Sequence, residues 1–342
     1  MKPLRVLVLM HVDLVPPDSL KGYSESEIVE WRTEFDVVST LRKMGHEVRP
    51  LGVYDDLGVI RQAIADWKPD IAFNLLEEFH GNALFDSHVV GFLELMKQPY
   101  TGCNPRGLLI AHDKALAKKI LSYHRIRTPR FAVIPRRTPI RLPRRLRFPL
   151  FVKSLIEEGS YGIAHASIVN TEEKFRERVE FLQEKLSTPV IAEEYIEGRE
   201  LYLGVLGHRR LEALPVIELQ FGKLSEDAPR IATHKVKWDP RYQKEYGIDS
   251  KLAENIEPKQ VQAFQELARR IYRTLDLSGY ARVDLRLAEN GEIFVLEANA
   301  NPDVAMEGEL AIAARAAGIS YEALLERVLR LGLSYSPEAR SR

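Results

Sequence analysis

The 342-residue sequence lacks several features that would place it in a common class. It has one cysteine, Cys103, which excludes an intrachain disulfide framework and a cysteine-based metal site. Its apolar run at 6–10 is far too short to span a membrane and has no small-residue cleavage site, so we expect a buried first strand there. No internal repeat or low-complexity tract is present. These absences predict an ordinary globular protein in a reducing, cytoplasmic compartment.

The chain also lacks an excess of charge of either sign. Its 49 Lys and Arg residues balance 49 Asp and Glu residues, which argues against a polyanion as the main partner. The one basic cluster, RRTPIRLPRRLR at 136–147, could form a nucleic-acid patch or a solvated connection between elements. Three prolines within it favour the connection. We therefore expect neither a nucleic-acid partner nor a membrane.

The first third of the chain alternates strand and helix patterns. Strands are expected at 5–10, 46–51 and 70–76. Helices are expected at 58–67 and 86–97, and also before Met44-Gly45, where Phe35, Val38 and Leu41 form one apolar stripe. Strands alternating with helices predict a small parallel α/β domain, which we place at residues 1–107.

The remainder reads as two α+β units, so the fold class combines α/β with α+β. The central unit, 108–195, opens with Asp113 as the N-cap of a helix. It continues with strands at 130–134, 149–154 and 164–169, a helix at 171–186 and a strand at 189–195. The third unit, 196–332, holds strands at 200–206 and 211–218, a polar loop at 223–256, a helix at 258–275 and a hairpin at 282–299. The tail, 333–342, ends in the charged segment SPEARSR (336–342), which is expected to be frayed.

The hairpin reads RVDLRLAENGEIFVLEAN. Its Asn290-Gly291 pair predicts a two-residue type I′ turn in which Glu289 faces Glu292. The same register places position 284 opposite 297, and position 282 opposite 299. Two carboxylates would then face each other, an arrangement that by itself destabilises a sheet.

The alternation of side chains sorts this hairpin into two faces. The apolar face is expected to hold Val283, Leu285, Leu287, Phe294, Leu296 and Ala298. The polar face would hold Arg282, Asp284, Glu297 and Asn299. Oxygen ligands on neighbouring strands suit a hard divalent cation. The alternative is a solvent-exposed polar face with a salt bridge from Arg282 to one carboxylate.

Two segments of the central unit are candidates for nucleotide contacts. In FPLFVKSLIEEGSYGI (148–163), a buried strand delivers Lys153, and a glycine-containing loop follows that would let backbone N–H groups approach an anion. The alternative for that loop is a plain hairpin. In PVIAEEYIEGREL (189–201), an apolar strand runs into a turn rich in acids. Its edge could meet an adenine and its carboxylates a ribose, or the turn could simply be solvated.

In their order along the chain, these motifs resemble the ATP-grasp superfamily, most closely the D-alanine–D-alanine ligase-like family. The resemblance covers residues 70–332 and rests on HDKALAKKIL, FVKSL, EEGSYGI, EEYIEGREL, KVKWD and RVD...LEAN. PYTGCNPRGLLIAHDKALAKKIL is similar to the junction between the first two domains of that family. The resemblance implies an ATP-grasp fold preceded by a small parallel α/β (pre-ATP-grasp) domain, with a homodimer as its oligomeric state.

The resemblance also implies roles for single residues. The ATP-binding set would be Lys114 and Lys153 on the phosphates, the loop residues Glu158, Gly159, Ser160, Tyr161 and Gly162 over them, Glu193, Glu194, Tyr195 and Ile196 at the adenine, and Glu200 on the ribose. Asp284, Glu297 and Asn299 would hold two magnesium ions, or manganese in their place. Lys237 would approach the γ-phosphate from a mobile loop, and Arg282 would stabilise an oxyanion.

The implied reaction is an ATP-dependent joining of a carboxylate to an amine. A substrate carboxylate attacks the γ-phosphate to give an acylphosphate, which an amine then attacks through a tetrahedral intermediate. Divalent ions between the facing carboxylates would turn their repulsion into coordination. The substrates would be amino acids or peptides.

The sequence departs from the family on its substrate side. The N-terminal Glu-Arg-Glu-Val-Ser signature is absent from 11–34, and FNLLEEFHGN puts Asn74, Glu77 and His80 at the first-substrate pocket. Asp303 replaces a family glycine, and Glu309 stands where a Ser-Leu pair receives the acceptor carboxylate. Two acids there would repel a free α-carboxylate, by about 4 kcal/mol for a pair at 4 Å in an intermediate dielectric. We therefore predict an acceptor other than D-alanine, one that carries an additional amine or lacks a free carboxylate.

Two alternatives stay open. One is a D-alanine–D-alanine ligase of cell-wall synthesis, which the core motifs favour. The other is an ATP-binding regulator without catalysis, against which the complete metal set and Arg282 argue.

Overall fold

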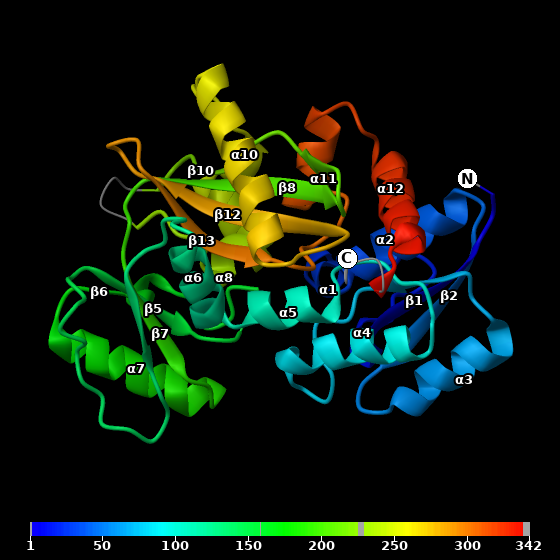
Figure 1. Cartoon of the computed structure of the whole chain (residues 1–342), viewed down its shortest axis with the longest axis horizontal. Coiled ribbons are helices and arrows are strands. Elements are labelled where there is room, and N and C mark those ends of the chain that lie inside the picture. The colour runs from blue at the N-terminus through cyan, green and yellow to red at the C-terminus, as the bar shows by residue number, and fades with distance from the viewer. Residues whose placement is uncertain (1, 158, 225–228, 338–342) are drawn as a thin grey trace.

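The computed structural model describes residues 2–157, 159–224 and 229–337, which form three β-sheets with helices packed around them (Figure 1). The first sheet is parallel, in the order β2-β1-β3, with strands Glu47–Val53, Arg5–His11 and Ile71–Asn74. Its helices are α1 (Glu25–Glu30), α2 (Arg32–Lys43), α3 (Leu57–Trp67) and α4 (Asp86–Leu95). The predicted small parallel α/β unit is therefore confirmed.

Strand β1 is buried on both faces, as its continuous apolar run predicts. Val6, Val8 and Met10 pack in one core cluster, and Leu7 and Leu9 pack in another. The first cluster includes residues of α12 (Tyr321–Ser334), near the C-terminus, which packs beside α2 and against β3 (Figure 1). Contacts therefore join the first and last parts of the chain, and the boundaries at 107, 195 and 332 stay a prediction.

The central sheet is antiparallel, in the order β4-β7-β5-β6, with strands Phe131–Ile134, Val190–Glu194, Leu150–Ser154 and Ile168–Val169. Helix α7 (Glu172–Leu186) covers one face with Phe175, Val179 and Leu182. Helices α5 (Pro105–His112) and α6 (Lys114–Tyr123) lead into it. Asp113 caps α6 as predicted, because its carboxylate accepts from the backbone N–H groups of Ala115 and Leu116.

The third sheet has six strands, ordered β11-β10-β8-β12-β13 with β9 beside β8. They are β8 (Arg199–Gly207), β9 (Leu211–Ala213), β10 (Ile217–Phe221), β11 (Ile248–Leu252), β12 (Tyr280–Leu287) and β13 (Ile293–Asn299). Helix α10 (Pro258–Thr274) covers one face, while α11 (Glu309–Ala316) lies against the other near β8 and β11. None of the helices in the described ranges is long and apolar enough to cross a membrane.

Several element predictions for this region were wrong. The segment expected as one strand at 211–218 is two, β9 and β10. The segment expected as a polar loop at 223–256 contains α8 (His234–Trp238), α9 (Pro240–Tyr246) and β11. Thr233 and Asp239 cap the two helices with their side chains, so the polar residues that suggested a loop are helix starts. In the central unit, the segment expected as a strand at 164–169 is a 3-10 turn (His165–Ser167) followed by the two-residue β6.

The hairpin of β12 and β13 has a different loop from the predicted one. The backbone pairs Ala288 with Glu292, and Gly291 donates to Ala288, so the loop has one more residue than a two-residue turn. A register shift between Asp284 and Leu285 compensates for it. The predicted pairs Asp284 with Glu297 and Arg282 with Asn299 are confirmed, although Glu289 does not face Glu292.

The same bulge corrects the predicted faces. Leu285 pairs with Val295, and Val295 takes the core position in place of Phe294 and Leu296. Leu296 turns to the polar face, where it lines a pocket, and Phe294 packs under the guanidinium of Arg127. A β-bulge adds one residue on one strand and so reverses the faces beyond it.

We predict that Gly332→Ala disturbs the packing of α12 against the first sheet and so destabilises the protein. A Cβ at Gly332 would overlap the carbonyl oxygen of Tyr100 and lie 2.8 Å from Ile71 Cδ1. The free energy of unfolding should fall by about 1–3 kcal/mol. Gly91→Ala is the matched control in helix α4, because the nearest atom to its new Cβ lies 4.0 Å away. That change should raise stability by about 0.5 kcal/mol. Thermal unfolding measures both, and equal midpoints would contradict the packing described.

Candidate active site

The site is built on one face of the six-stranded sheet. Register places Asp284 beside Tyr202 and Arg286 beside Glu200, so the polar side chains of β12 and β8 share that face. The opposite face of the same strands is the apolar core under α10. Polar and apolar residues alternate along β12 and β8, so the apolar side chains form the core on one face and the polar side chains form the site on the other.

Arg282 neutralises the carboxylate pair on one side. Its Nε donates to Oδ1 of Asp284 at 2.8 Å and its Nη2 to Oδ2 at 3.0 Å. Asn299 Nδ2 donates to the same Oδ2 at 3.0 Å. The remaining Nη1 of Arg282 donates to Oε2 of Glu309 at 2.9 Å. The salt bridge considered from sequence thus exists, but it is buried rather than exposed to solvent.

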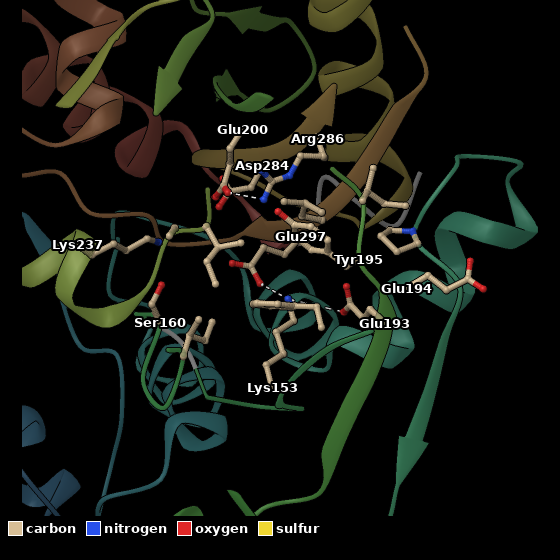
Figure 2. A pocket seen from close by; sticks show the side chains of 17 residues that line it. Lys153, Ser160, Glu193, Glu194, Tyr195, Glu200, Lys237, Asp284, Arg286 and Glu297 are labelled. Atoms are coloured by element: carbon tan, nitrogen blue, oxygen red, sulfur yellow. Dashed lines mark hydrogen bonds and ion pairs between the residues drawn. The ribbon is translucent and has the colours of Figure 1, made fainter. Parts of the chain in front are cut away.

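Lysines neutralise the pair on the other side. Lys153 Nζ lies 3.5 Å from Glu297 and 3.7 Å from Glu193 (Figure 2). Lys118 Nζ lies 3.4 Å from the second oxygen of Glu193 and donates to the backbone carbonyl of Leu296 at 2.7 Å. Positive and negative charges therefore alternate from Lys118 to Glu297, each within reach of the next.

Burial and charge compete in this network. Burial acts to raise the pKa of Glu297, but Lys153, Lys114 and Lys237 outweigh it and hold that pKa far below the usual range. Burial raises the pKa of Asp284 against the opposing effect of Arg282. Glu297 is therefore the more firmly ionised of the two carboxylates.

A pocket opens between the central and third sheets (Figure 2). Its lining includes most of the predicted nucleotide residues: Lys153, Ser160, Glu193, Glu194, Tyr195, Ile196, Glu200, Lys237, Asp284 and Glu297. Phe151, Ile163, Ile231 and Leu296 add apolar wall. An apolar slot with a few fixed charges suits a ligand with a flat ring and a charged tail.

The glycine loop lies beside this pocket. Ser160 lines it, and positive φ angles at Gly159, Ser160 and Gly162 shape the turn. Tyr161 and Gly162 are not among the lining residues; Tyr161 is half exposed and meets the ring of His234 edge-on. Glu158 lies outside the described residues. Lys114 approaches from α6 and donates to the carbonyl of Glu157 at 2.7 Å.

A second cavity, of about 480 Å³, adjoins the first and shares Lys237 and Glu297 with it. Acidic side chains on its wall outnumber basic ones: Glu77, Asp249, Glu297, Asp303, Glu307 and Glu309 face Arg32, Lys237 and Arg282. Lys237, expected on a mobile loop, stands on the short helix α8. The two cavities therefore meet at Lys237 and Glu297.

Buried carboxyl groups lie on helix α2 and on the loop after β13, and one of them, Asp303, lines this cavity. Asp303 accepts from the hydroxyl of Thr33 at 2.7 Å and from the backbone of Ala305 at 2.8 Å, and burial raises its pKa. Asp36 accepts from the backbone N–H of Met306 at 2.9 Å. Glu34 is buried on the same helix, and burial raises its pKa to about 8. Helix α2 thereby anchors the loop after β13.

The structure brings together most of the predicted substrate residues, with two exceptions. Glu77, Asp303 and Glu309 line the second cavity. Asn74 is buried at the end of β3, where its Oδ1 accepts from the backbone of Leu76, and it is not part of the lining. His80 stacks on Tyr54 away from the cavity.

Three residues were missed from sequence. Lys118 stands one turn after Lys114 on α6, a spacing that signals a shared face. Arg286 follows Asp284 at the period of a strand and pairs with Glu200 at 2.8 Å. Trp238 donates from Nε1 to the carbonyl of Gly159 at 2.8 Å and so links α8 to the glycine loop.

The chemistry of the donor set fits a hard divalent cation. Asp284 and Glu297 are register partners on adjacent strands, and Asn299 follows Glu297 by two positions. Among the described residues, no group of three or more His, Cys, Asp or Glu side chains is arranged to hold a metal. Two carboxylates with an amide oxygen therefore form the candidate set, and water and phosphate oxygens are the usual remaining ligands of magnesium.

Fold and site together define an ATP-grasp ligase: a pocket lies between two antiparallel sheets, and the facing carboxylates Asp284 and Glu297 line it. A family model described as D-ala D-ala ligase C-terminus matches residues 116–330. The chain belongs to the D-alanine–D-alanine ligase-like family, whose members form C–N bonds with release of ADP.

Individual relatives agree with this family. A D-alanine–D-alanine ligase of Desulforudis audaxviator is 32% identical over 91% of this chain and 95% of its own length. An uncharacterized protein, y4sG, of Sinorhizobium fredii is 31% identical over 86% of this chain and 85% of its own. The crystal structure of a D-alanine–D-alanine ligase from Bacillus anthracis complexed with ATP superposes with a TM-score of 0.74 at 25% identity, covering 96% of this chain and 97% of that one.

We predict that Lys118→Met destabilises the protein. The substitution leaves a buried carboxylate, Glu193, with one cation in place of two. Breaking a buried charge pair costs about 3–5 kcal/mol. Lys119→Met, on the exposed side of the same helix, is the control. Thermal unfolding should show a large loss for the first and little change for the second, and equal losses would contradict the network.

We predict a pH-dependent gain from Glu34→Gln. The carboxyl titrates at 4.5 ordinarily and at about 8 in the folded protein. Between these values the folded state holds the extra proton, so its stability falls as pH rises. The amide removes that penalty and should raise the unfolding midpoint near about pH 9, with little effect near about pH 5. Glu30→Gln, at an exposed position on α1, is the control. A gain independent of pH would refute this account.

Proposed function

We propose that this protein is an ATP-dependent carboxylate–amine ligase that works through an acylphosphate and uses an acceptor without a free α-carboxylate. The donor carboxylate attacks the γ-phosphorus of ATP and ADP leaves. The acceptor amine then attacks the acyl carbon, phosphate leaves, and an amide remains. The two adjoining cavities support this order, because Lys237 and Glu297 line both of them.

The first cavity would bind ATP. The segment Glu194 to Ile196, where β7 ends, supports an adenine subsite, and Glu200 supports a ribose contact. Lys153 and Lys114 would meet the phosphates, since both lie close enough to Glu297 to lower its pKa. Asp284, Glu297 and Asn299 would hold magnesium, which when bound neutralises charge on the phosphates.

The second cavity would bind the donor and the acceptor. Lys237 would reach the γ-phosphate from α8, where it lines both cavities. Arg282 is buried and fixed by its bonds to Asp284, so its position needs no rearrangement during the reaction. A preorganised guanidinium beside the developing oxyanion lowers the barrier by about 3 kcal/mol.

The pairing of Glu309 with Arg282 is the observation that carries the choice of acceptor. All the hydrogen bonds assigned to this guanidinium go to Asp284 and Glu309. Burial acts to raise the pKa of Glu309, but Arg282 and Lys237 keep it lowered, so this carboxylate stays charged. An acceptor α-carboxylate at this end would meet a like charge in place of a free cation. A neutral or cationic group would suit the position better.

The rival function is that of an authentic D-alanine–D-alanine ligase. The relatives that carry this name, among them the Desulforudis audaxviator protein, favour it. The two functions share the donor chemistry and differ in the acceptor alone. The choice therefore depends on the surroundings of Glu309.

We predict that the enzyme prefers D-alaninamide to D-alanine as acceptor. The two compounds differ only in the α-carboxylate, and ADP release with mass detection of the product reports on both. With D-alanine as donor, or with the best donor of an amino-acid panel, kcat/KM should favour the amide by about tenfold or more. A preference for D-alanine would establish the rival function.

Glu309→Ser should reverse this preference by freeing a donor group of Arg282. Glu307→Ser is the matched control, because Glu307 lines the same cavity but pairs with Arg315 at the surface. The control should keep the preference of the parent enzyme. An unchanged ratio in the Glu309 variant would remove that residue from acceptor choice.

A further inference from the structure

Helix α7 carries a buried arginine that lines neither of the two adjoining cavities. Arg178 is 7% exposed and forms no ion pair with a carboxylate in the part of the chain that the structure describes. Burial lowers its pKa, and no described charge offsets that effect. A buried charge without an opposite charge is costly, so its presence requires a physical reason.

The guanidinium of Arg178 reaches the glycine loop. Its Nη2 donates to the backbone carbonyl of Gly162 and, at 2.7 Å, to Oγ of Ser167. Two leucines of the same helix pack on the same glycine, because a Cβ at Gly162 would lie 3.1 Å from Leu186 Cδ1 and 3.3 Å from Leu182 Cδ2. Helix α7 therefore holds the end of the glycine loop by one polar and two apolar contacts.

Other carbonyl groups in and beside this loop are also taken up by donors. Gly159 accepts from Nε1 of Trp238 at 2.8 Å. Ser160 accepts from the backbone N–H of Ile163 at 2.9 Å, and Ile163 accepts from the backbone N–H of His234 at 3.2 Å. Donors on α7, on α8 and within the loop thus hold these carbonyl oxygens.

The backbone N–H groups of the loop show the opposite pattern. Those of Ser160, Tyr161 and Gly162 have no acceptor among the residues that the structure describes. Successive N–H groups in such a turn form an anion-binding concavity, whereas carbonyl oxygens near an anion would repel it. Ser160 lines the pocket between the two sheets (Figure 2). The loop therefore has its carbonyls occupied and its N–H groups available to an anion.

We propose that Arg178 is a positioning residue for the phosphates of the bound nucleotide and acts through the glycine loop. By holding the carbonyl of Gly162 on α7, it keeps the loop in the shape in which its N–H groups donate to phosphate oxygens. Lys114 and Lys153 would meet the phosphates directly, whereas Arg178 touches no ligand. This inference rests on the proposed use of ATP by this pocket.

Binding of ADP and of adenosine to the full chain, each with magnesium, tests this role without knowledge of the acceptor. In Arg178→Met, the affinity for ADP should fall by about tenfold to a hundredfold, the range for a hydrogen bond to a charged group. The affinity for adenosine should stay that of the parent, because adenosine has no phosphate for the loop to hold. Calorimetric titration measures ADP, and competition against ADP measures adenosine. AMP, which lacks the terminal phosphates, replaces adenosine if the latter binds too weakly to measure.

Two further variants keep the test decisive. Arg178→Lys retains a cation that can donate to the carbonyl of Gly162, so its affinity for ADP should lie between those of the parent and the methionine variant. It also serves as the test if the methionine variant does not fold. Arg176→Met is the matched control, because Arg176 is exposed on the same helix and pairs with Glu172. It should keep the parent affinity for both ligands.

Each outcome has a distinct meaning. A purely structural role for Arg178 would weaken both ligands by the same factor or leave both unchanged, and either result would overturn this inference alone. Equal binding of ADP and adenosine by the parent protein would overturn it as well, because the loop would then add nothing for the phosphates. If the parent binds neither ligand, the nucleotide site itself is refuted, and the proposed function falls with it.

Discussion

The pairing of β12 with β13 beyond the bulge at Leu296 is the constraint on which the site depends. It sets Asp284 opposite Glu297, an arrangement that a sheet tolerates only when neighbouring charges compensate for it. Arg282 compensates on one side and Lys153 on the other. A slip of one residue would turn these side chains into the core and expose the apolar face. Folding of the core under α10 therefore also enforces the geometry of the site.

The compensating charges come from separate parts of the chain. Lys118 lies on α6, Lys153 on β5 and Lys237 on α8. Lys118 pairs with Glu193 of the central sheet, while Lys153 and Lys237 lower the pKa of Glu297 on the third sheet. The network therefore depends on how the two sheets are placed, because Lys153 lies on the central sheet and Glu297 on the third. Displacing either sheet would leave buried charges without partners, which is far costlier than the loss of a surface pair.

The sequence was sufficient to predict that Asp284 pairs with Glu297. It was not sufficient to predict the longer loop and the bulge that together produce this pairing. A longer loop and a bulge each shift the numbering by one in opposite senses, so the simple two-residue turn gave the right partners. Between the loop and the bulge, and at the bulge itself, it gave the wrong face for Phe294 and Leu296, since no residue in β13 signals a bulge on its own. Helices α8 and α9 were missed although Thr233 and Asp239 are good caps, because short helices draw their stability from tertiary contacts. The burial of Lys118 was also missed, because it depends on tertiary contacts that the sequence of α6 alone does not show.

Arg282 connects the two cavities electrostatically, because one guanidinium serves both Asp284 and Glu309. A residue at position 309 that does not pair with Arg282 would leave Asp284 as the one carboxylate among the described residues that this guanidinium contacts. The charge would then change beside the proposed phosphate site as well as beside the proposed acceptor site. If the two cavities bind ATP and the acceptor as proposed, substrate choice and phosphoryl transfer would not be independent. An acceptor whose own charge disturbs Arg282 would also disturb Asp284, which is a physical reason for an acidic residue at 309 to accompany an acceptor that is neutral or cationic there.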